Sequence, residues 1–586
     1  MLVYGDAVRR EAAADKLTAV RGLFKRIEAL DEGLERHSAL IAALIESGEL
    51  AQGIADAEFA AAGECETPSP PTRACMALVM AVAACCSESW SSSFAHVPAL
   101  PFDELARCEP LIPSGLIDVK QPEGYAFYAV YPEAWFEAAR GLSRHQWQVF
   151  GVRSIGTSLA CMVAAGLHAG PPITLRPIGQ PFDRRIAASR IAIEPTLGNH
   201  AVVDEGPGLS GSSMAAVAQW LVQQQVPADR LHFFPSHDNG PGPRASTGTR
   251  ALWRAAHVHF VGFDELFVET HAPARHIGTW VAQAVGFLER PLTDIGNGRW
   301  RALQTRESDL PPSHPWQERR KFLAAANGSR WLVKFAGLGR YGAETFRRAL
   351  ILAEAGFTPE AIALRHGFLI ERWRDDLRPL PAQVQGELRT RLVTCIGDYL
   401  AFRARSFAAP SASGASMEEL YRMGRHNTEQ ALGSELGSVW DQWRRTLPDL
   451  AQSVHRVETD NRMHAWEWLA DAESILKTDA VDHHAGHDLI GCQDIAWDIA
   501  GAAVELELGR DELGTVIERI SRVTGRRPDR DLLDFVQPCY VAFQLGYYHE
   551  AKAGSGDVHE IARLDAALTR YSGALRQILE HGSLTA

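Results

Sequence analysis

The chain has few of the features that mark metal-binding, secreted or nucleic-acid-binding proteins. Nine cysteines are spread over 586 residues, and no two of them form a Cys-x-x-Cys pair. This spacing argues against a structural zinc site and is typical of reduced thiols. Lysine and arginine form no basic run and the formal net charge is −13, so the electrostatic field does not favour binding of a nucleic-acid backbone. The most apolar run, Met76 to Cys86, is too short to span a bilayer. We therefore expect a cytoplasmic protein with no nucleic-acid or membrane partner.

Two common catalytic motifs are also missing. No Gly-x-x-x-x-Gly-Lys-Ser/Thr loop occurs, which excludes a P-loop ATPase. The segment from Gly208 to Ser212 lacks the final glycine of the Gly-x-Ser-x-Gly elbow of hydrolases, so its central Ser210 is better suited to binding a phosphate. The length predicts three or four domains, because single hydrophobic cores stop growing at roughly 250 to 300 residues.

The pattern of apolar residues changes along the chain. Residues 1–110 show helical spacing, and we assign them no chemistry, leaving a docking or dimerisation role open. Residues 111–245 alternate apolar strands, among them Tyr125 to Tyr131, with helices, which predicts a parallel sheet of α/β type. A connecting segment, 246–284, leads to a second unit of α+β character over 285–380 and 381–586, which ends in helices. Assembly into a homo-oligomer is left open.

An acidic loop follows one of the predicted strands. Asp204 and Glu205 end the apolar stretch, and a loop of glycines and serines then leads into an apolar helix. Ligands of parallel sheets bind at the carboxyl ends of strands, and N–H groups at a helix N-terminus bind phosphate. The loop residues Ser210, Gly211, Ser212 and Ser213 are therefore candidates for phosphate binding, with the two carboxylates next to a sugar. The alternative is an ordinary strand–turn–helix connection.

This stretch resembles the phosphoribosyl-diphosphate (PRPP) loop of type I phosphoribosyltransferases, although three residues, 206–208, separate the acids from the loop where two are usual. The resemblance implies PRPP with Mg²⁺ as co-substrate and catalytic roles for Asp204 and Glu205. It also implies a pyrophosphate loop after an earlier strand, which here would contain Arg153, Ser154, Gly156 and Thr157. Three further arginines (Arg176, Arg184 and Arg185) could form a flap over the diphosphate, or simply a solvated surface loop.

The second half carries a different order of residues. Lys334 lies in a predicted apolar strand, Glu344 in the helix predicted to follow, and Glu371 in the later stretch 367–373. This order resembles the N-terminal lobe of small-molecule kinases such as aminoglycoside and choline phosphotransferases. The resemblance implies that Lys334 binds ATP phosphates and pairs with Glu344, and that the chain near Glu371 meets adenine. The alternative is a lysine that extends to solvent at a strand edge.

Acidic residues needed for phosphoryl transfer follow in the expected places. By the same resemblance, Asp460 occupies the catalytic loop, and Asp479 or Asp482 binds Mg²⁺. We favour Asp482, because Ala480 and Val481 give it an apolar approach. Where this family carries a metal-binding asparagine, the chain has Ala465, and Glu467 could replace that ligand. Downstream, Asp494 and Asp498 match the acids that brace the catalytic loop.

Three histidines, His483, His484 and His487, lie close together beside these acids. A transition-metal site is one interpretation, and solvated histidines near a nucleotide pocket are the more favoured one. The sequence as a whole predicts a bifunctional enzyme in which phosphoribosyl transfer is joined to ATP-dependent phosphorylation of a small hydroxyl compound. The alternative is a regulatory protein that binds PRPP and ATP with one or both sites inactive.

Overall fold

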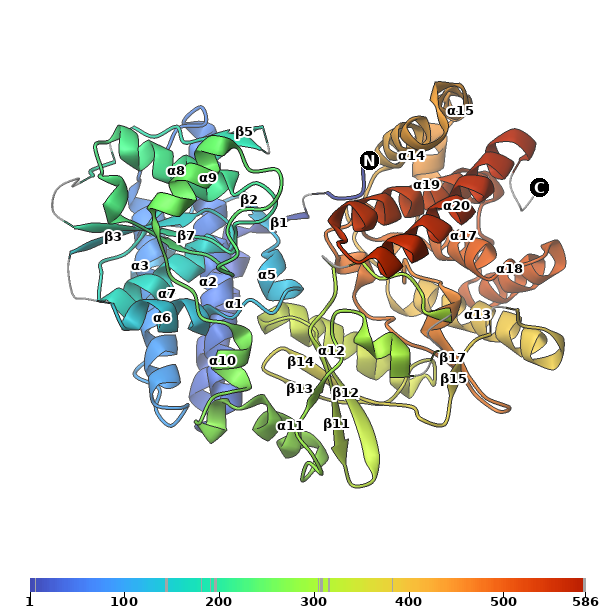
Figure 1. The fold of residues 1–586 in the computed structure, drawn as a ribbon, viewed down its shortest axis with the longest axis horizontal. Helices are drawn as coiled ribbons and strands as arrows, with labels where there is room; N and C mark the ends of the chain where they lie inside the picture. Colours follow the sequence, from blue (N-terminus) through green and yellow to red (C-terminus); the bar gives the residue numbers. More distant parts are fainter. Residues whose placement is uncertain are drawn as a thin grey trace.

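The structure, a computed structural model, describes residues 1–5, 7–142, 146–180, 182–189, 191–193, 198–303, 305, 309–314, 317–381 and 383–582. Figure 1 shows two large bodies, one formed by the first half of the chain and the other by the second, which meet near α5 and α12. The helices of the first half are α1 Ala13–Ala29, α2 Leu34–Ala61, α3 Pro70–Ser91, α4 Phe102–Cys108, α5 Glu123–Ala126, α6 Pro132–Arg140, α7 Gly156–Leu167, α8 Ser212–Gln223, α9 Thr247–Ala255, α10 Phe263–Phe267 and α11 Ile277–Val285.

A five-stranded parallel sheet organises the first half, as predicted. Its order is β4 (Ile173–Leu175), β3 (Trp147–Val152), β7 (Asn199–Val203), β8 (Leu231–Phe234) and β9 (His257–Val258), and every neighbouring pair is parallel. A separate hairpin of β5 (Ile178–Gln180) and β6 (Asp183–Arg185) follows β4. The strand predicted at 125–131 is wrong: the stretch begins with the last residues of α5, and α6 starts directly after it at Pro132.

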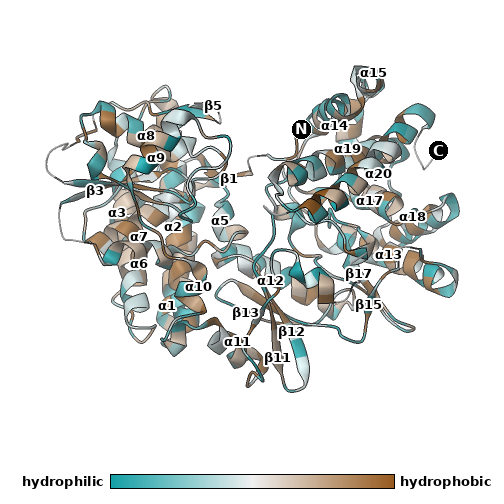
Figure 2. Ribbon diagram, in the orientation of Figure 1, coloured by the Kyte–Doolittle hydropathy of each residue, from teal (hydrophilic) through white to brown (hydrophobic). Residues whose placement is uncertain are grey.

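Alternating residues of the strands belong to two different hydrophobic clusters. Val149 of β3 and Val203 of β7 belong to a cluster that includes α7, α2 and α3, whereas Phe150 and Val202 belong to another that includes α8. Because successive strand residues point to opposite faces, both faces of the sheet are covered by helices. The helices of the first hundred residues therefore form one face of the α/β layer, and Figure 2 shows α2, α3 and α7 as apolar along much of their length.

One helix of this layer would also pass a length test for a membrane span. The 22 residues of α3 are apolar enough, by length and composition, to cross a bilayer. In the structure, 61% of its most apolar stretch is buried inside the protein, where it packs against α2 and α7. Burial of this kind is typical of a core helix.

The second half joins an antiparallel sheet to a helical lobe. The sheet order is β10 (Thr293–Asp294), β11 (Lys321–Ala326), β12 (Ser329–Phe335), β14 (Phe368–Arg372) and β13 (Ala361–Arg365), with α12 (Gly339–Glu354) between β12 and β13 in the chain. The lobe contains α13 Gly386–Ser406, α14 Met417–Leu432, α15 Ser434–Val439, α16 Leu447–Ser453, α17 Ala496–Glu505, α18 Arg510–Thr524, α19 Arg530–Gly554 and α20 Val558–His581. Its short strands are β15 Arg378–Pro379, β16 Arg456–Val457, β17 Trp468–Ala470, β18 Ile475–Lys477 and β19 Gln493–Asp494.

The N-terminal segment connects the two halves. The N–H of Gly5 donates to the carbonyl of His487 (3.1 Å), and the N–H of Leu2 donates to the side chain of Asn427 (2.7 Å). A few residues later, β1 (Val8–Ala12) pairs antiparallel with β2 (Leu116–Lys120) in the first half. The chain therefore begins on the helical lobe and crosses to the α/β layer, as Figure 1 shows.

A buried carboxylate forms a second connection between the halves. Glu133 of α6 accepts hydrogen bonds at 2.9 Å from His37 of α2 and from His366, which lies in the β13–β14 turn. Burial alone would raise the pKa of Glu133, but its bonds to His366 and His37 lower it to about 2. The ionised carboxylate thus holds the N-terminal helices against the antiparallel sheet.

Candidate functional site: a cleft between the antiparallel sheet and the helical lobe

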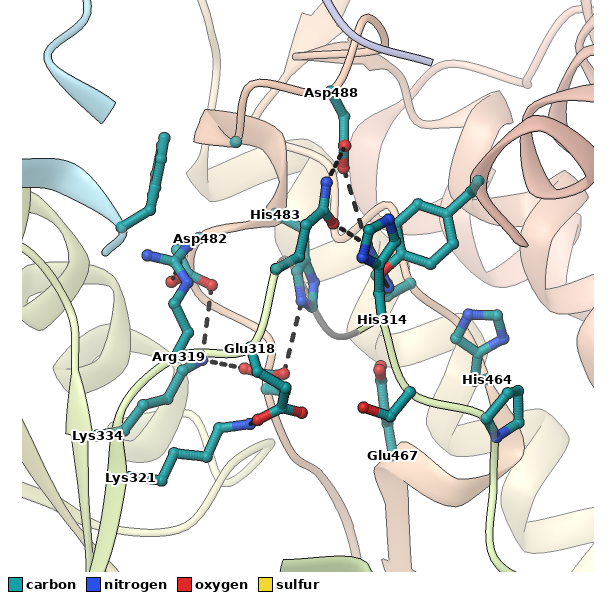
Figure 3. A pocket seen from close by; sticks show the side chains of 18 of the residues that line it. His314, Glu318, Arg319, Lys321, Lys334, His464, Glu467, Asp482, His483 and Asp488 are labelled. Atoms are coloured by element: carbon teal, nitrogen blue, oxygen red, sulfur yellow. Dashed lines mark hydrogen bonds and ion pairs between the residues drawn. The ribbon is translucent and has the colours of Figure 1, made fainter. Parts of the chain in front are cut away.

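Two adjoining cavities lie where the antiparallel sheet meets the helical lobe, and both are lined by Lys334, Glu467 and Asp479. One, of about 130 Å³, is largely apolar and lies beneath Leu332, Trp373 and Leu469. The other, of about 120 Å³, is polar and is shown in Figure 3. A largely apolar cavity beside a polar one offers room for a ligand that has both an apolar ring and charged groups.

Lys334 is the cation at the junction of the two cavities. It lies near the end of β12, opposite Leu369 of β14, and its ammonium forms an ion pair with Asp479 and lies 3.7 Å from a carboxylate oxygen of Asp482. Burial alone would lower the pKa of Lys334, but the two aspartates raise it above its ordinary value. The sequence prediction that this lysine belongs to a charged site is consistent with this geometry.

The predicted partner of Lys334 is wrong. Glu344 of α12 is exposed, while Arg348, one turn later on the same face, is buried and reaches the helical lobe. Its guanidinium donates to the carbonyl of Val481 (2.7 Å) and lies 3.5 Å from Glu458. Residues four apart lie on one face of a helix, so the helical period cannot say whether the turn with Glu344 or the next turn, with Arg348, meets the lobe.

Asp479 and Asp482 both reach Lys334 at the junction of the two cavities. The structure therefore does not select one of them over the other as the metal ligand. Asp479 follows β18 by two residues, and together with Asp482 and His483 it offers ligand atoms within 4.8 Å of one another. Neither oxygen of Asp482 accepts a well-directed hydrogen bond among the described residues, although both are buried. Burial alone would raise the pKa of Asp482, but Arg319 and Lys334 hold it well below its ordinary value. Ionised, unsatisfied carboxylate oxygens are suitable ligands for Mg²⁺.

Glu467, the third predicted metal ligand, is bound differently. Its carboxylate accepts a hydrogen bond of 2.8 Å from the ammonium of Lys477, which is fully buried. In the part of the chain that the structure describes, Glu467 belongs to neither of the two clusters whose ligand atoms lie close enough to hold an ion. Lys477, at the end of β18, therefore binds the carboxylate of Glu467, which we expected to bind the metal ion.

Asp460 lies behind the cavity surface instead of on it. Its carboxylate accepts from the hydroxyl of Tyr399 and lies 3.5 Å from Lys477 and 3.7 Å from the ring of His483. Burial alone would raise the pKa of Asp460, but Lys477 and His483 hold it well below its ordinary value. His483, unlike Asp460, lines the polar cavity, so the aspartate meets the site through the imidazole.

His483 bridges the two acidic loops. Its ring lies within 3.7 Å of Asp460 and 3.6 Å of Asp479. Burial alone would lower the pKa of His483, but these two carboxylates raise it to about 9. The imidazole is therefore a cation at neutral pH, which favours an electrostatic role in this arrangement over that of a neutral metal ligand.

The predicted bracing acids are in place. Both oxygens of Asp498 accept backbone N–H groups of the Asp460 loop, at 2.8 Å from Asp460 and 2.9 Å from Asn461. Asp494 accepts from the N–H of His455 (2.9 Å) and from the guanidinium of Arg526 (2.6 Å). Burial raises the pKa of Asp498 to about 6. These contacts fix the loop on which Asp460 lies.

Glu371 lies beside the apolar cavity, as the adenine prediction requires. It pairs with Leu332 across β14 and β12 and lines the cavity with Trp373. Burial raises the pKa of Glu371 to about 7, with Lys334 opposing the shift. The segment that leaves β14 here is the connection between the sheet and the helical lobe.

The acidic loop of the first half ends β7 at the carboxyl edge of the parallel sheet, as predicted. Asp204 and Glu205 are partly exposed, and Glu205 accepts a 2.9 Å hydrogen bond from the N–H of Gly124. Burial raises the pKa of Asp204 to about 7, and burial together with Asp204 raises that of Glu205 to about 8. The charges of Arg184 and Arg176 oppose the shift of Asp204 without cancelling it.

The serine loop precedes α8, but its groups bind one another. The N–H of Ser212 and the hydroxyl of Ser210 form a 3.2 Å hydrogen bond, and the two hydroxyls are 3.0 Å apart. Gly211 adopts a positive φ of 63°, which suits the turn into the helix. Ser213 lies in the first turn of α8 and is partly exposed. The phosphate role of these residues stays a prediction.

Arg153 does not face this loop as a free cation, contrary to prediction. The side chain is 2% exposed and donates to Glu66 (2.5 Å) and Asp56 (3.2 Å). Arg176 pairs with Asp56 as well. The acids that neutralise these arginines lie in or just after α2, a part of the chain to which we assigned no chemistry. A buried, fully paired guanidinium holds two elements together and leaves no charge for pyrophosphate.

The other residues of the predicted pyrophosphate loop are close to the acidic strand end. A Cβ on Gly156 would lie 2.8 Å from the carbonyl of Val203, so this glycine lets α7 approach β7. Ser154 has a positive φ of 130°, a strained conformation for a residue with a side chain. Thr157 is buried, and its hydroxyl accepts and donates no hydrogen bond within the described residues. The loop is therefore placed as predicted, while its ligand stays a prediction.

No protein-family model and no curated protein matches the chain. Solved structures of small-molecule phosphotransferases are similar to it. The choline kinase LicA from Streptococcus pneumoniae is 14% identical, with a TM-score of 0.30 over 43% of this chain and 89% of that one. The spectinomycin phosphotransferase APH(9)-Ia, solved with ADP and spectinomycin, is 11% identical (TM-score 0.31, 53% and 95%). The macrolide 2′-phosphotransferase MphH from Brachybacterium faecium is 16% identical (TM-score 0.30, 46% and 95%).

Several residues of the cleft carried no recognisable signal in the sequence. Arg403 of α13 is fully buried and donates to the carbonyls of Glu458 (2.5 Å) and Ala480 (2.8 Å), so it ties both acidic loops together. Arg319 and Arg462 line the polar cavity. Arg403 and Arg319 lie outside any predicted motif, and Arg462 follows Asp460 by two residues in the predicted catalytic loop. Only the assembled fold brings each of them to the acids. The spacing of Arg403 one turn after Tyr399 on a helix is too common to be diagnostic.

Proposed function

We propose that the second half of the chain is a kinase-like phosphotransferase that transfers a phosphoryl group from ATP to a hydroxyl group of a small molecule. The observation that carries the proposal is the junction at Lys334, where two ionised aspartates meet an apolar cavity on one side and a polar cavity on the other. The chemistry of phosphoryl transfer is mostly positioning and charge neutralisation. These are the functions that the residues of this junction can perform.

The apolar cavity suits adenine. Trp373 and Leu469 provide flat and apolar walls, and Glu371 lies at its edge. From there the phosphates of ATP would extend to the ammonium of Lys334. Asp479 and Asp482 would hold Mg²⁺, which supplies charge neutralisation of the phosphates when bound. The polar cavity is then the place for the hydroxyl compound.

The protein's own cations complete the site. His483, protonated at neutral pH, faces the polar cavity with Asp460 behind it. We assign Asp460 the role of a positioning residue that keeps His483 charged and oriented. The imidazolium then stabilises negative charge that develops on the transferred group. The catalytic role that we expected for Asp460 is therefore exerted through a histidine.

A second candidate is an ATP-binding regulatory domain without turnover. It is favoured by the ion pair between Arg319 and Asp482 and by Ala465, which stands where the resembled kinases carry a metal-binding asparagine. In the first half, phosphoribosyl transfer with PRPP stays a prediction, because the paired Arg153 removes one of the cations that we expected at a diphosphate.

The test is a search for phosphorylated products. The full-length protein would be incubated with ATP, Mg²⁺ and a small-molecule extract, and masses that increase by one phosphoryl group would be recorded by mass spectrometry. Lys334→Met is the matched inactive variant. The proposal predicts ADP formation together with at least one new phosphorylated compound in the wild type alone. Binding of ATP with no product in any extract would favour the regulatory candidate, and absence of ATP binding would contradict both.

A further inference from the structure

Arg319 connects the predicted metal site to the α/β half of the chain. Its guanidinium lies 3.0 Å from a carboxylate oxygen of Asp482. The same guanidinium donates to the carbonyl of Ala126 at 3.1 Å and lies over the ring of Phe127, 4.5 Å from its centroid. Ala126 ends α5 and Phe127 follows it, so both belong to the first half. Figure 3 shows Arg319, Lys334 and Asp482 together on one side of the cavity.

The segment that holds Arg319 is itself anchored at both ends. The N–H of Gly124, in α5, donates to Glu205 of the acidic loop (2.9 Å), and the carbonyl of Tyr125 accepts from the N–H of Leu338 (2.9 Å). On the other side, the hydroxyl of Tyr128 is 3.1 Å from the ring of His487, in the polar cavity. A five-residue stretch, 124–128, therefore contacts the acidic loop of one half and the cleft of the other.

The contact between Arg319 and Asp482 is an ion pair without a well-directed hydrogen bond. Both carboxylate oxygens of Asp482 are buried and lack such a bond among the described residues, and the side chain of Arg319 is only 13% exposed. A cation held at this distance neutralises the aspartate but leaves its oxygens available to a better-placed ligand. Arg319 is thus positioned to compete with a divalent cation for Asp482.

Resting on the proposed function, we propose that Arg319 is a positioning residue that neutralises Asp482 until Mg²⁺ binds with ATP, and that the α/β half sets its position through Phe127 and Ala126. With Asp482 holding Mg²⁺, the guanidinium would be free to bind the phosphates, whose oxygens bind arginine well. The Mg²⁺ requirement of the second half therefore depends on a residue pair that the first half controls.

The experiment measures how ATP binding depends on Mg²⁺ in full-length protein, by calorimetric titration over a series of Mg²⁺ concentrations. Arg319→Gln removes the competing cation, so the Mg²⁺ concentration at half-saturation should fall by about fivefold or more, the lower end of coupling between linked sites. Arg319→Lys, which restores the charge without the planar stacking group, should give an intermediate value. An unchanged Mg²⁺ dependence in both variants would overturn the inference.

The neighbouring arginine is a matched control. Arg320 also pairs with a carboxylate, Asp264 (2.6 Å), and lies over an aromatic ring, Phe263 (4.2 Å), but it does not line the cleft. Arg320→Gln should leave the Mg²⁺ dependence unchanged, and a shift equal to that of Arg319→Gln would show a general effect of lost charge and refute the assignment.

Control by the α/β half is tested separately. Phe127→Leu removes the ring under the guanidinium and should lower the Mg²⁺ requirement in the same direction. Combined with Arg319→Gln it should add nothing further, whereas full additivity would refute coupling through this contact.

In the wild type, hydrogen exchange of residues 124–128 should become faster when ATP and Mg²⁺ are added together, and unchanged exchange would contradict the release of Arg319. Wild-type protein that binds no ATP would refute the proposed function itself, while ATP binding with unaltered Mg²⁺ dependence in the variants would refute only this inference.

Discussion

The acidic pair at the end of β7 should make the stability of the α/β half depend on pH near neutrality. In an unfolded chain, Asp204 and Glu205 ionise near pH 4, whereas burial raises their pKa values in the folded protein to about 7 and about 8. The folded state therefore binds more protons between these limits. Linkage then requires stability to fall as pH rises from about 4 to about 8.

The substitution Glu205→Gln isolates this effect. Glutamine keeps an oxygen that can accept the hydrogen bond from Gly124 but carries no charge. A shift of three to four pKa units corresponds to about 4 to 5 kcal/mol. Since the side chain is partly exposed, solvent screens the charge, and we take about 2 kcal/mol as the expected gain in unfolding free energy above about pH 8.

The measurement is urea-induced unfolding of wild type and variant at about pH 5 and about pH 9, followed by a probe in the first half. The gain should be present at the higher pH and small at the lower one. Glu265→Gln, an exposed glutamate on α10, should change neither. An equal gain at both pH values would refute the reasoning, because a packing effect does not depend on ionisation.

Three further predictions concern the cleft and the contact between the halves. Lys334→Met should lower ATP affinity about tenfold or more in calorimetry and also destabilise the fold, by about 3 kcal/mol, because removing one partner leaves buried carboxylates unpaired. Trp373→Ala should weaken ATP binding by about 1 to 3 kcal/mol, the range for loss of stacking on a base, with no change in Mg²⁺ dependence. Glu133→Gln should reduce the free energy of unfolding by about 3 kcal/mol at neutral pH, since the pKa of Glu133 is lowered to about 2. That loss should shrink as pH falls below about 4.5, and a pH-independent loss would show that charge is not its cause.

The sequence predicted the fold best where a local pattern of apolar residues recurs along the chain. The alternation of apolar strands and helices was enough to predict the parallel sheet, and two acids after an apolar strand were enough to place Asp204 and Glu205 at its edge. The strand predicted at 125–131 is wrong because apolar residues of this stretch are buried in the hydrophobic core without pairing in a sheet. Periodicity alone cannot distinguish these forms of burial.

The candidate site was predictable only in part, for a physical reason. Lys334, Asp479 and Asp482 were identified by their order along strands and loops, and they meet in the structure. The partners of those residues could not be identified, because a charged side chain accepts any suitable counter-charge that the fold brings near. Lys334 thus pairs with aspartates and not with Glu344. Arg153 pairs with acids in and just after α2, and His483 lies between Asp460 and the polar cavity.

The central claim is that ATP binds in the cleft between the antiparallel sheet and the helical lobe. The most direct measurement is a crystal structure of the full-length protein with a non-hydrolysable ATP analogue and Mg²⁺. The account predicts the adenine beside Trp373, the phosphates at Lys334 and the metal ion on Asp479 and Asp482. Nucleotide bound elsewhere, with Lys334 still paired to Asp479 and the apolar cavity empty, would contradict it.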